Sequence, residues 1–324
     1  MEKLNWCIIG TGKIANEFAS QFHVENAQLY GVASKTKDQA EQFAKNHQVE
    51  KVFGSYEEVL ECDSVDVVYI ATPHNYHYDM IIKALESGKN VVCEKSITIS
   101  KAQLERAVEL AQAKNLYLFE AMTIHYMPLY QNLKEWAKEH EVGKLKMVQV
   151  NFGSFKDLDP SFYYFNKDLA GGALLDIGVY AINFARWFLT SRPTEIRTLG
   201  NIHETGVDES SAIILQNQER ELATISLTFR AKMPKQGIVA YENGYFTITD
   251  YPRADRATFT NSTGEVTIIE AGHSVEGLNY EANVISNIIL QKKANPHLSY
   301  TLDVMEVMEK VRNDWGLHYS FEDE

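Results

Sequence analysis

Cysteine is scarce in this chain. Of its 324 residues only Cys7, Cys62 and Cys93 are cysteines, and no CxxC pair occurs. This usage excludes a disulfide framework and fits a reducing compartment, so we expect the protein to be cytoplasmic. Cys7 and Cys93 stand inside apolar, strand-like runs, which is typical of small core residues.

Basic charge is also in short supply, with 31 Lys and Arg against 44 Asp and Glu and a formal net charge of −13. No basic cluster interrupts this balance, which argues against nucleic acid or an anionic membrane as the main partner. No uninterrupted apolar run approaches the ~20 residues that span a bilayer. Residues 1–6 lead directly into a strand, without the features of a targeting segment.

The length of the chain favours two domains, which we place at residues 1–121 and 122–324. In the first of them, short apolar strands alternate with amphipathic helices. This pattern predicts an α/β domain with a doubly wound parallel sheet. The expected strands are 4–9, 28–33, 51–53, 65–71, 90–93 and 116–120.

A glycine motif follows the first expected strand at once: Gly10-Thr11-Gly12-Lys13-Ile14-Ala15 has the form G-x-G-x-x-A. In a dinucleotide-binding loop the first glycine permits a tight turn and the second lets the backbone approach a pyrophosphate. The small third residue keeps the helix close to its strand. The motif alone would also suit a structural turn, but its place between a strand and a helix favours a nucleotide site.

The second expected strand ends in Ser34-Lys35-Thr36-Lys37. An NAD-specific site carries an acidic residue near this point, about 20 residues beyond the glycines, to bind the ribose 2′-hydroxyl. This chain offers a hydroxyl and a cation instead, which suits a 2′-phosphate. We therefore predict a preference for NADP(H), with NAD as the alternative if Lys35 is only a solvated loop residue.

Residues 122–324 contain more strands than helices. Between residues 220 and 230, Ala223, Ile225, Leu227 and Phe229 face one way and polar residues the other, as in a half-buried antiparallel strand. The sequence thus predicts an α+β C-terminal domain with a large, mostly antiparallel open sheet. Further strands are expected at 144–155, 196–203, 210–216, 238–241, 245–249, 257–260 and 266–270, and helices at 280–290 and 302–315.

The apolar stretch 171–187 predicts a helix that opens with a glycine pair. Asp176 and Tyr180 are four residues apart, so both project from the same face. A carboxylate among Leu, Ile and Val side chains is costly unless it is hydrogen-bonded or paired with a cation. We interpret the two residues as functional, the alternative being a core tyrosine whose hydroxyl is satisfied locally.

Together these segments resemble the Gfo/Idh/MocA family of nicotinamide-dependent oxidoreductases. The resemblance is carried by GTGKIA at 10–15, ATPHNYH at 71–77, EKS at 94–96 and GGALLDIGVY at 171–180. Glu120-Ala121-Met122 and Pro128 make the branch of dimeric dihydrodiol dehydrogenases and xylose dehydrogenases the most similar. The resemblance implies an N-terminal Rossmann domain, a small-molecule substrate bound by the C-terminal domain, and a homodimer formed through the large sheet.

The resemblance also implies roles for single residues. Lys95 matches the lysine that contacts both the substrate and the nicotinamide ribose. Asp176 and Tyr180 match the acidic residue of the second domain and the residue four places later. The expected cofactor side further includes Ala71, Thr72, Pro73, His74, His77 and Glu94, and the expected substrate side Met122, His125, Phe155 and Tyr163.

Several positions depart from the family pattern. Ser96 replaces the usual proline of EKP, and His74 stands where Asn is commoner. Tyr163 and His125 stand where the nearest branch has Arg, so the substrate of that branch does not transfer directly to this chain. His77 is expected to support its loop, and no metal is expected because no HxH or HExxH spacing occurs.

Hydride transfer at an alcohol carbon needs a proton acceptor for the alcohol oxygen. A free phenol has a pKa near ~10, and a nearby ammonium favours the phenolate. We therefore expect Tyr180 and Lys95 to act as an acid/base pair, and Asp176 to hold a hydroxyl of a sugar or trans-dihydrodiol. Two alternatives stay open, namely an NAD-dependent glycosidase of the same fold and a non-catalytic nucleotide or sugar sensor.

Overall fold

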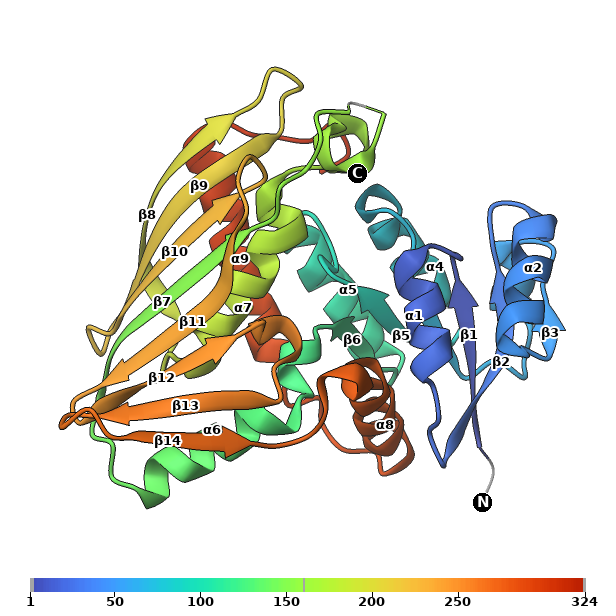
Figure 1. Cartoon of the computed structure of the whole chain (residues 1–324). Coiled ribbons are helices and arrows are strands. Elements are labelled where there is room, and N and C mark those ends of the chain that lie inside the picture. Colours follow the sequence, from blue (N-terminus) through green and yellow to red (C-terminus); the bar gives the residue numbers. More distant parts are fainter. Residues whose placement is uncertain (1–2, 160, 323–324) are drawn as a thin grey trace. The chain divides into compact units, whose positions relative to one another are not determined.

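The structure is a computed structural model that describes residues 3–159 and 161–322. The chain forms two compact units, one of residues 1–122 and 275–298 and the other of residues 123–274 and 299–324 (Figure 1). The division expected from the sequence, 1–121 and 122–324, differs because the chain returns to the first unit. The returning segment carries helix α8 (Gly277–Leu290).

Helix α8 is tied to the first unit by hydrogen bonds from its first turn. The backbone N–H of Leu278 donates to Gln21 Oε1 at 3.2 Å, and Asn279 Oδ1 accepts from the backbone N–H of His23 at 2.9 Å. These partners are far apart along the chain. A division of the chain into two continuous segments therefore assigns this helix to the second domain, together with its neighbours in sequence.

The predicted parallel sheet is confirmed in the first unit, where six strands lie in the order β3-β2-β1-β4-β5-β6. This is the order of doubly wound dinucleotide-binding sheets, whose ligands lie beyond the carboxyl ends of the strands at the point where the order reverses. Here that point lies between β1 and β4. The elements are β1 (Leu4–Ile9), α1 (Lys13–Gln21), β2 (Ala27–Ala33), α2 (Lys37–His47), β3 (Lys51–Val52), α3 (Tyr56–Glu61), β4 (Val67–Ile70), η1 (His74–Tyr76), α4 (His77–Glu86), β5 (Asn90–Glu94), α5 (Lys101–Ala113) and β6 (Leu118–Ala121).

The second unit contains the predicted open sheet, with eight strands in the order β14-β13-β12-β11-β7-β10-β9-β8. Neighbouring strands are antiparallel except β10 and β7, which pair in parallel. The alternation expected in β10 is confirmed, because Ala223, Ile225 and Leu227 are buried. The strands are β7 (Leu145–Gly153), β8 (Pro193–Ile202), β9 (Asp208–Asn217), β10 (Leu222–Thr228), β11 (Met233–Tyr241), β12 (Gly244–Thr249), β13 (Arg256–Asn261) and β14 (Val266–Glu270).

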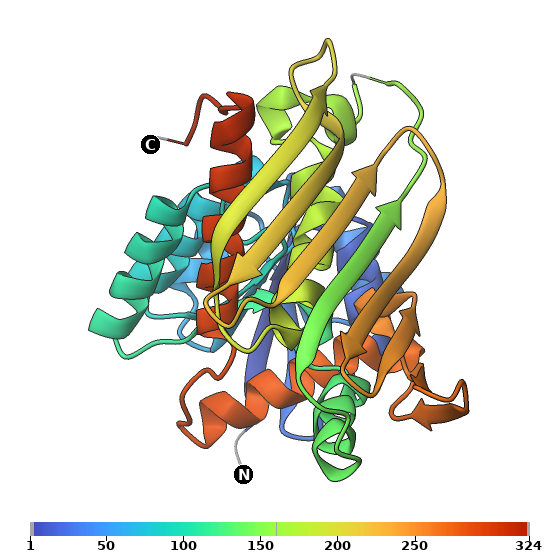
Figure 2. The same cartoon turned by 90° about the vertical axis from the view of Figure 1, so that its left-hand side faces the viewer.

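Helices of this unit pack on one face of the sheet. Helix α7 (Val179–Phe188) lies against β7 and β10, so closely that a Cβ on Gly178 would stand 2.7 Å from the Leu227 side chain. Figure 2 shows the opposite face, with the strands in front and α7 behind them. The unit also contains α6 (Pro128–Glu139) and nearly all of α9 (Leu298–Trp315).

The predicted helix over 171–187 differs from expectation at its start. It begins as a π-helix, Leu174–Gly178, and continues as α7. Single π-helical turns are rare and frequently mark functional sites. By length and composition the stretch Lys167–Phe188 would also pass for a membrane span, but 78% of the tested window is buried inside the protein, as in a core helix.

Candidate active site

The glycine motif forms the turn between β1 and α1. Gly10 has a φ of +99°, and a Cβ there would stand 2.5 Å from the carbonyl oxygen of Ala71. A side chain at Gly10 is therefore excluded. Gly12 faces open space, with no atom within 4 Å of its Cβ position, and it immediately precedes α1. The loop thus leaves room for a phosphate beside the first N–H groups of a helix, where negative charge is stabilised.

The end of β2 lies next to this loop. Ser34 Oγ is 2.8 Å from Thr11 Oγ1 and 3.2 Å from Gln39 Oε1, so its hydroxyl fixes the loop. Lys35 is exposed and has no ion-pair partner in the part of the chain that the structure describes. Lys37, by contrast, pairs with Glu41 at 3.8 Å. Lys35 is thus the available cation at this end of the strand.

His77 joins the loops that follow β4 and β5. Its side chain is fully buried, with Nδ1 2.8 Å from the Ser96 carbonyl oxygen and Nε2 2.8 Å from that of Thr72. Burial, reinforced by the charge of His74, lowers the pKa of His77 to about 4, although the two carbonyl oxygens oppose this shift. The ring is neutral at pH 7 and supports the loop from inside.

Thr72 also lies in the loop after β4. Its Oγ1 is buried and has no hydrogen-bond partner among residues 3–159 and 161–322. Buried hydroxyls are normally satisfied by protein or water, so this atom can accept or donate a bond to a bound group. Together with the open space at Gly12, it makes the carboxyl edge of this sheet fit a dinucleotide.

Glu94 is the last residue of β5 and Lys95 follows it, and the two side chains differ in burial. Glu94 is buried and accepts a hydrogen bond from the Tyr69 hydroxyl within the unit. Lys95 is the one residue from 91 to 100 that keeps partial exposure, and the peptide bond between it and Ser96 is cis. Lys95 is therefore the side chain that this edge offers to a ligand. Met122, which follows β6, is buried.

In the second unit, the π-helical turn and α7 present Asp176 and Tyr180. From residue 171 to residue 185 these two alone keep partial solvent exposure, and every other residue is buried. Tyr163, from the short helix η3 (Tyr163–Phe165), lies beside them. Burial raises the pKa of the Tyr163 phenol, and the next largest cause is the charge of Asp176, with Tyr180 contributing as well. The structure thus brings these three predicted residues together.

Aromatic side chains lie behind Tyr180. The Phe152 ring is 6.4 Å from that of Tyr180 and 6.1 Å from that of Tyr251. Tyr251 is fully buried, and its hydroxyl has no hydrogen-bond partner among the described residues. Burial raises the pKa of Tyr251, and Tyr180 adds to the shift. Tyr180 therefore stands on an apolar support with one further hydroxyl close by.

The two remaining substrate-side candidates differ in their surroundings. Phe155 is 58% exposed, with the Arg230 guanidinium 5.9 Å from its ring. His125 is only 7% exposed, and its ring stacks on Trp187 with 5.6 Å between centroids. Phe155 can cover a ligand, whereas His125 mainly contributes to the packing of the unit.

Two residues that hold the start of this helix were not expected from the sequence. Asp208, at the start of β9, is fully buried, and its Oδ2 accepts from the backbone N–H of Leu174 at 2.7 Å. Gly172 has a φ of +120°, and a Cβ there would stand 2.3 Å from Asp208 Oδ1. The Tyr319 hydroxyl donates to the Gly171 carbonyl at 2.5 Å. No local sequence pattern predicts either contact.

Asp208 has an unusual ionisation. Burial raises its pKa to about 7, although the Leu174 N–H and the Arg312 guanidinium act in the opposite direction. A carboxyl group that titrates near neutral pH therefore braces the turn that carries Asp176.

Comparisons with known proteins agree with this arrangement. Two family models match, the oxidoreductase family with an NAD-binding Rossmann fold over residues 4–122 and the GFO/IDH/MocA C-terminal domain over residues 130–247. Trans-1,2-dihydrobenzene-1,2-diol dehydrogenase of Xenopus laevis is 30% identical over 97% of this chain and 98% of its own length. The Mus musculus protein of that name is 31% identical over 74% of this chain and 73% of its own.

Solved structures share the fold. A 3-ketoreductase from Actinomadura kijaniata in complex with NADP and TDP-benzene has a TM-score of 0.84 at 21% identity, covering 96% of this chain and 98% of that one. Levoglucosan dehydrogenase in complex with NADH and levoglucosan has a TM-score of 0.88 at 16% identity, covering 97% and 98%. With both domains matched and a curated relative aligned over nearly its whole length, this chain belongs to the Gfo/Idh/MocA family of nicotinamide-dependent oxidoreductases.

Proposed function

We propose that this protein is an NADP(H)-dependent oxidoreductase acting on a hydroxyl or carbonyl carbon of a sugar or a trans-dihydrodiol. The observation that carries the proposal is that Asp176 and Tyr180 alone are partly exposed in the otherwise buried stretch 171–185. The names of the relatives, dihydrodiol dehydrogenase and levoglucosan dehydrogenase among them, support the substrate class. Bound nicotinamide would supply or accept the hydride.

Each proposed residue has one task. The Tyr180 phenolate takes the proton from the alcohol, or the Tyr180 hydroxyl gives a proton to the carbonyl oxygen, and the Lys95 ammonium favours the phenolate form. Asp176 accepts a hydrogen bond from a second substrate hydroxyl. The rings of Tyr163 and Phe155 cover the apolar face of the substrate.

Substrate turnover tests this proposal against its alternatives. We expect the absorbance of the reduced nicotinamide to change when the protein is given NADP(H) and a panel of aldoses, sugar ketones and trans-dihydrodiols. Glycoside hydrolysis without net cofactor consumption would favour the glycosidase, and binding without turnover would favour the sensor. Either result would overturn the proposal.

Cofactor preference gives a test of Lys35. In a Lys35→Ala variant, kcat/KM for NADPH is expected to fall about tenfold, the effect of losing roughly 1.4 kcal/mol of charge-assisted bonding to a 2′-phosphate. The value for NADH should stay unchanged. Lys37→Ala is the matched control, since that lysine already pairs with Glu41. A wild-type preference for NADH would show that the NADP(H) assignment is wrong.

We also propose a homodimer through the helix-free face of the large sheet. This face exposes apolar side chains at both ends: Leu199, Ile214, Tyr245, Val266 and Ile268. The strand register puts them on one side, because Ile268 pairs with Thr258, Thr258 with Thr247, and Thr247 with Ile238. Exposed apolar groups on one flat surface are typical of an interface.

Light scattering after gel filtration tests the dimer. The double variant Ile214→Lys, Ile268→Lys is expected to be monomeric at concentrations where the wild type is dimeric, because both lysines would be buried unpaired. Val275→Lys is the control, since Val275 is more exposed than either isoleucine but lies in the first unit. A monomeric wild type would contradict the proposal.

A further inference from the structure

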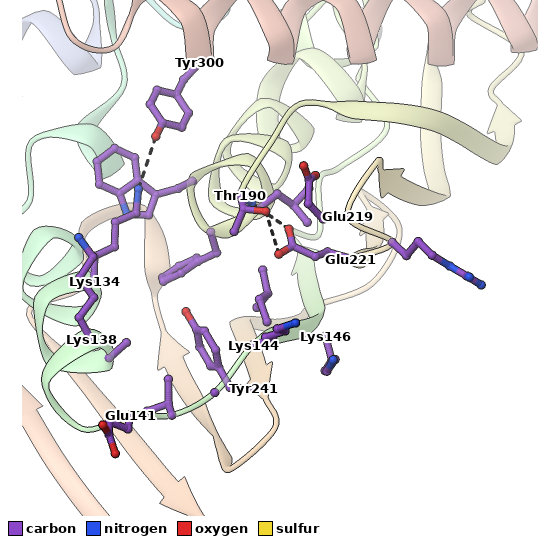
Figure 3. A pocket seen from close by; sticks show the side chains of 18 residues that line it. Lys134, Lys138, Glu141, Lys144, Lys146, Thr190, Glu219, Glu221, Tyr241 and Tyr300 are labelled. Carbon is purple, nitrogen blue, oxygen red and sulfur yellow. Dashed lines mark hydrogen bonds between the residues drawn. The ribbon is translucent and has the colours of Figure 1, made fainter.

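The second unit contains a pocket that none of the proposed catalytic residues lines. Its volume is about 1120 Å³, and its walls come from α6, the loop before β7, the end of α7, the β9–β10 turn and the first turn of α9 (Figure 3). This is enough space for a drug-sized molecule, whose sites measure roughly 300–1,000 Å³.

Lys134 is the most unusual group in this pocket. Its Nζ lies 3.8 Å from the centre of the Trp187 ring and 5.5 Å from that of Tyr300, and it donates to Tyr300 Oη at 3.5 Å. No carboxylate comes within 4.0 Å of this half-buried ammonium in the described part of the chain. Burial, followed by the charges of Arg186 and Lys138, lowers the pKa of Lys134 to about 8.

In the rest of the lining, Lys and Arg side chains outnumber carboxylates. Lys138, Lys144 and Arg220 also line the pocket and have no ion-pair partner among the residues described. The carboxylate of Glu221, which also lines the pocket, accepts from Thr190 Oγ1 at 2.9 Å and from Asn217 Nδ2 at 2.6 Å. Figure 3 shows the Thr190 contact.

Glu141 and Glu219 line the pocket as well, so that its lining carries five Lys and Arg side chains against three carboxylates. Glu219 accepts a hydrogen bond from Ser191, and Glu141 is exposed. In a chain whose net charge is −13, a lining with this excess of cations favours an anionic ligand over a cationic one. Its aromatic walls, formed by Tyr241, Phe188 and Trp187, add affinity for an apolar ring.

We propose that this pocket binds a small molecule that carries a carboxylate or phosphate group on an aromatic or other apolar ring. The anionic group pairs with Lys134, for which the described residues provide no counter-ion. The ring packs against the aromatic wall, and the remaining lysines strengthen the positive potential at the entrance. A carboxylate and a phosphate would make the same contact with Lys134, and the choice of probes distinguishes between them.

Calorimetric titration of the full-length protein tests the proposal, with NADPH present in excess so that the nucleotide site is filled. The probes are 1-naphthoate, 1-naphthyl phosphate and inorganic phosphate. At least one naphthyl probe is expected to bind saturably and more tightly than inorganic phosphate. In Lys134→Met, which keeps the apolar stem, its Kd should rise about tenfold or more, and Lys134→Arg should restore part of the loss.

Lys310→Met serves as the control, because Lys310 pairs with Asp314 at 3.1 Å on α9 and does not line the pocket. Its affinity for the probes should equal that of the wild type. As a second readout, trinitrobenzenesulfonate near pH 8 should label Lys134 ahead of the other lysines, and the bound probe should protect it. Absence of saturable binding by both naphthyl probes, or equal affinity in Lys134→Met, would overturn the proposal.

Discussion

A Tyr180→Phe variant is expected to turn over roughly 10²- to 10⁴-fold more slowly than the wild type, because it lacks the hydroxyl proposed to carry the proton. The phenyl ring keeps its packing next to Phe152, so the fold and the affinity for the cofactor should be unchanged. The measurements are kcat from the absorbance of the reduced nicotinamide and the Kd of NADPH from fluorescence titration.

Two further variants test whether the loss of turnover in Tyr180→Phe comes from the proposed acid/base role. Tyr245→Phe removes a partly exposed hydroxyl from β12, on the open face of the sheet, and should leave kcat at the wild-type value. Lys95→Met should lower kcat as well, and combining it with Tyr180→Phe should add little, because groups that act as one unit are not additive. Wild-type turnover in Tyr180→Phe would show that the acid/base assignment is wrong.

Asp208 is expected to make the free energy of unfolding depend strongly on pH. Burial raises the pKa of this carboxyl from 3.8 to about 7 in the folded protein. Between these two values the folded state holds a proton that the unfolded state has released. The free energy of unfolding therefore falls as the pH rises from about 4 to about 7 and levels off above that range. The full loss is of the order of 4 kcal/mol, at ~1.36 kcal/mol for each pKa unit.

Urea unfolding of the wild type and of Asp208→Asn across this pH range measures the effect. Asparagine does not titrate, yet its side-chain oxygen can still accept from the Leu174 N–H. The free energy of unfolding of the wild type, relative to that of the variant, should therefore decrease as the pH rises. Asp314→Asn, on the exposed part of α9, should give a profile parallel to the wild type. Parallel profiles for the wild type and Asp208→Asn would contradict the proposed titration.

The sequence by itself determined the nucleotide-binding half and the character of the open sheet. Its signals are local there: the spacing of Gly10 and Gly12 reflects a single turn, and the alternation from Ala223 to Leu227 reflects one strand. The spacing of Asp176 and Tyr180 is equally local. It put both side chains on one face even though the helix begins with a π turn, since four residues make about one turn in either kind of helix.

Only the tertiary structure decided what surrounds these residues. Asp208 holds Leu174 and Tyr319 holds Gly171 across 34 and 148 residues of chain. Helix α8 packs on the first unit although its sequence neighbours belong to the second. His125 and Lys134 both lie against the Trp187 ring. No sequence pattern reveals that Lys134 has no carboxylate partner among the described residues. Such contacts join residues distant in sequence, and their burial, not their spacing, sets their charge and their role.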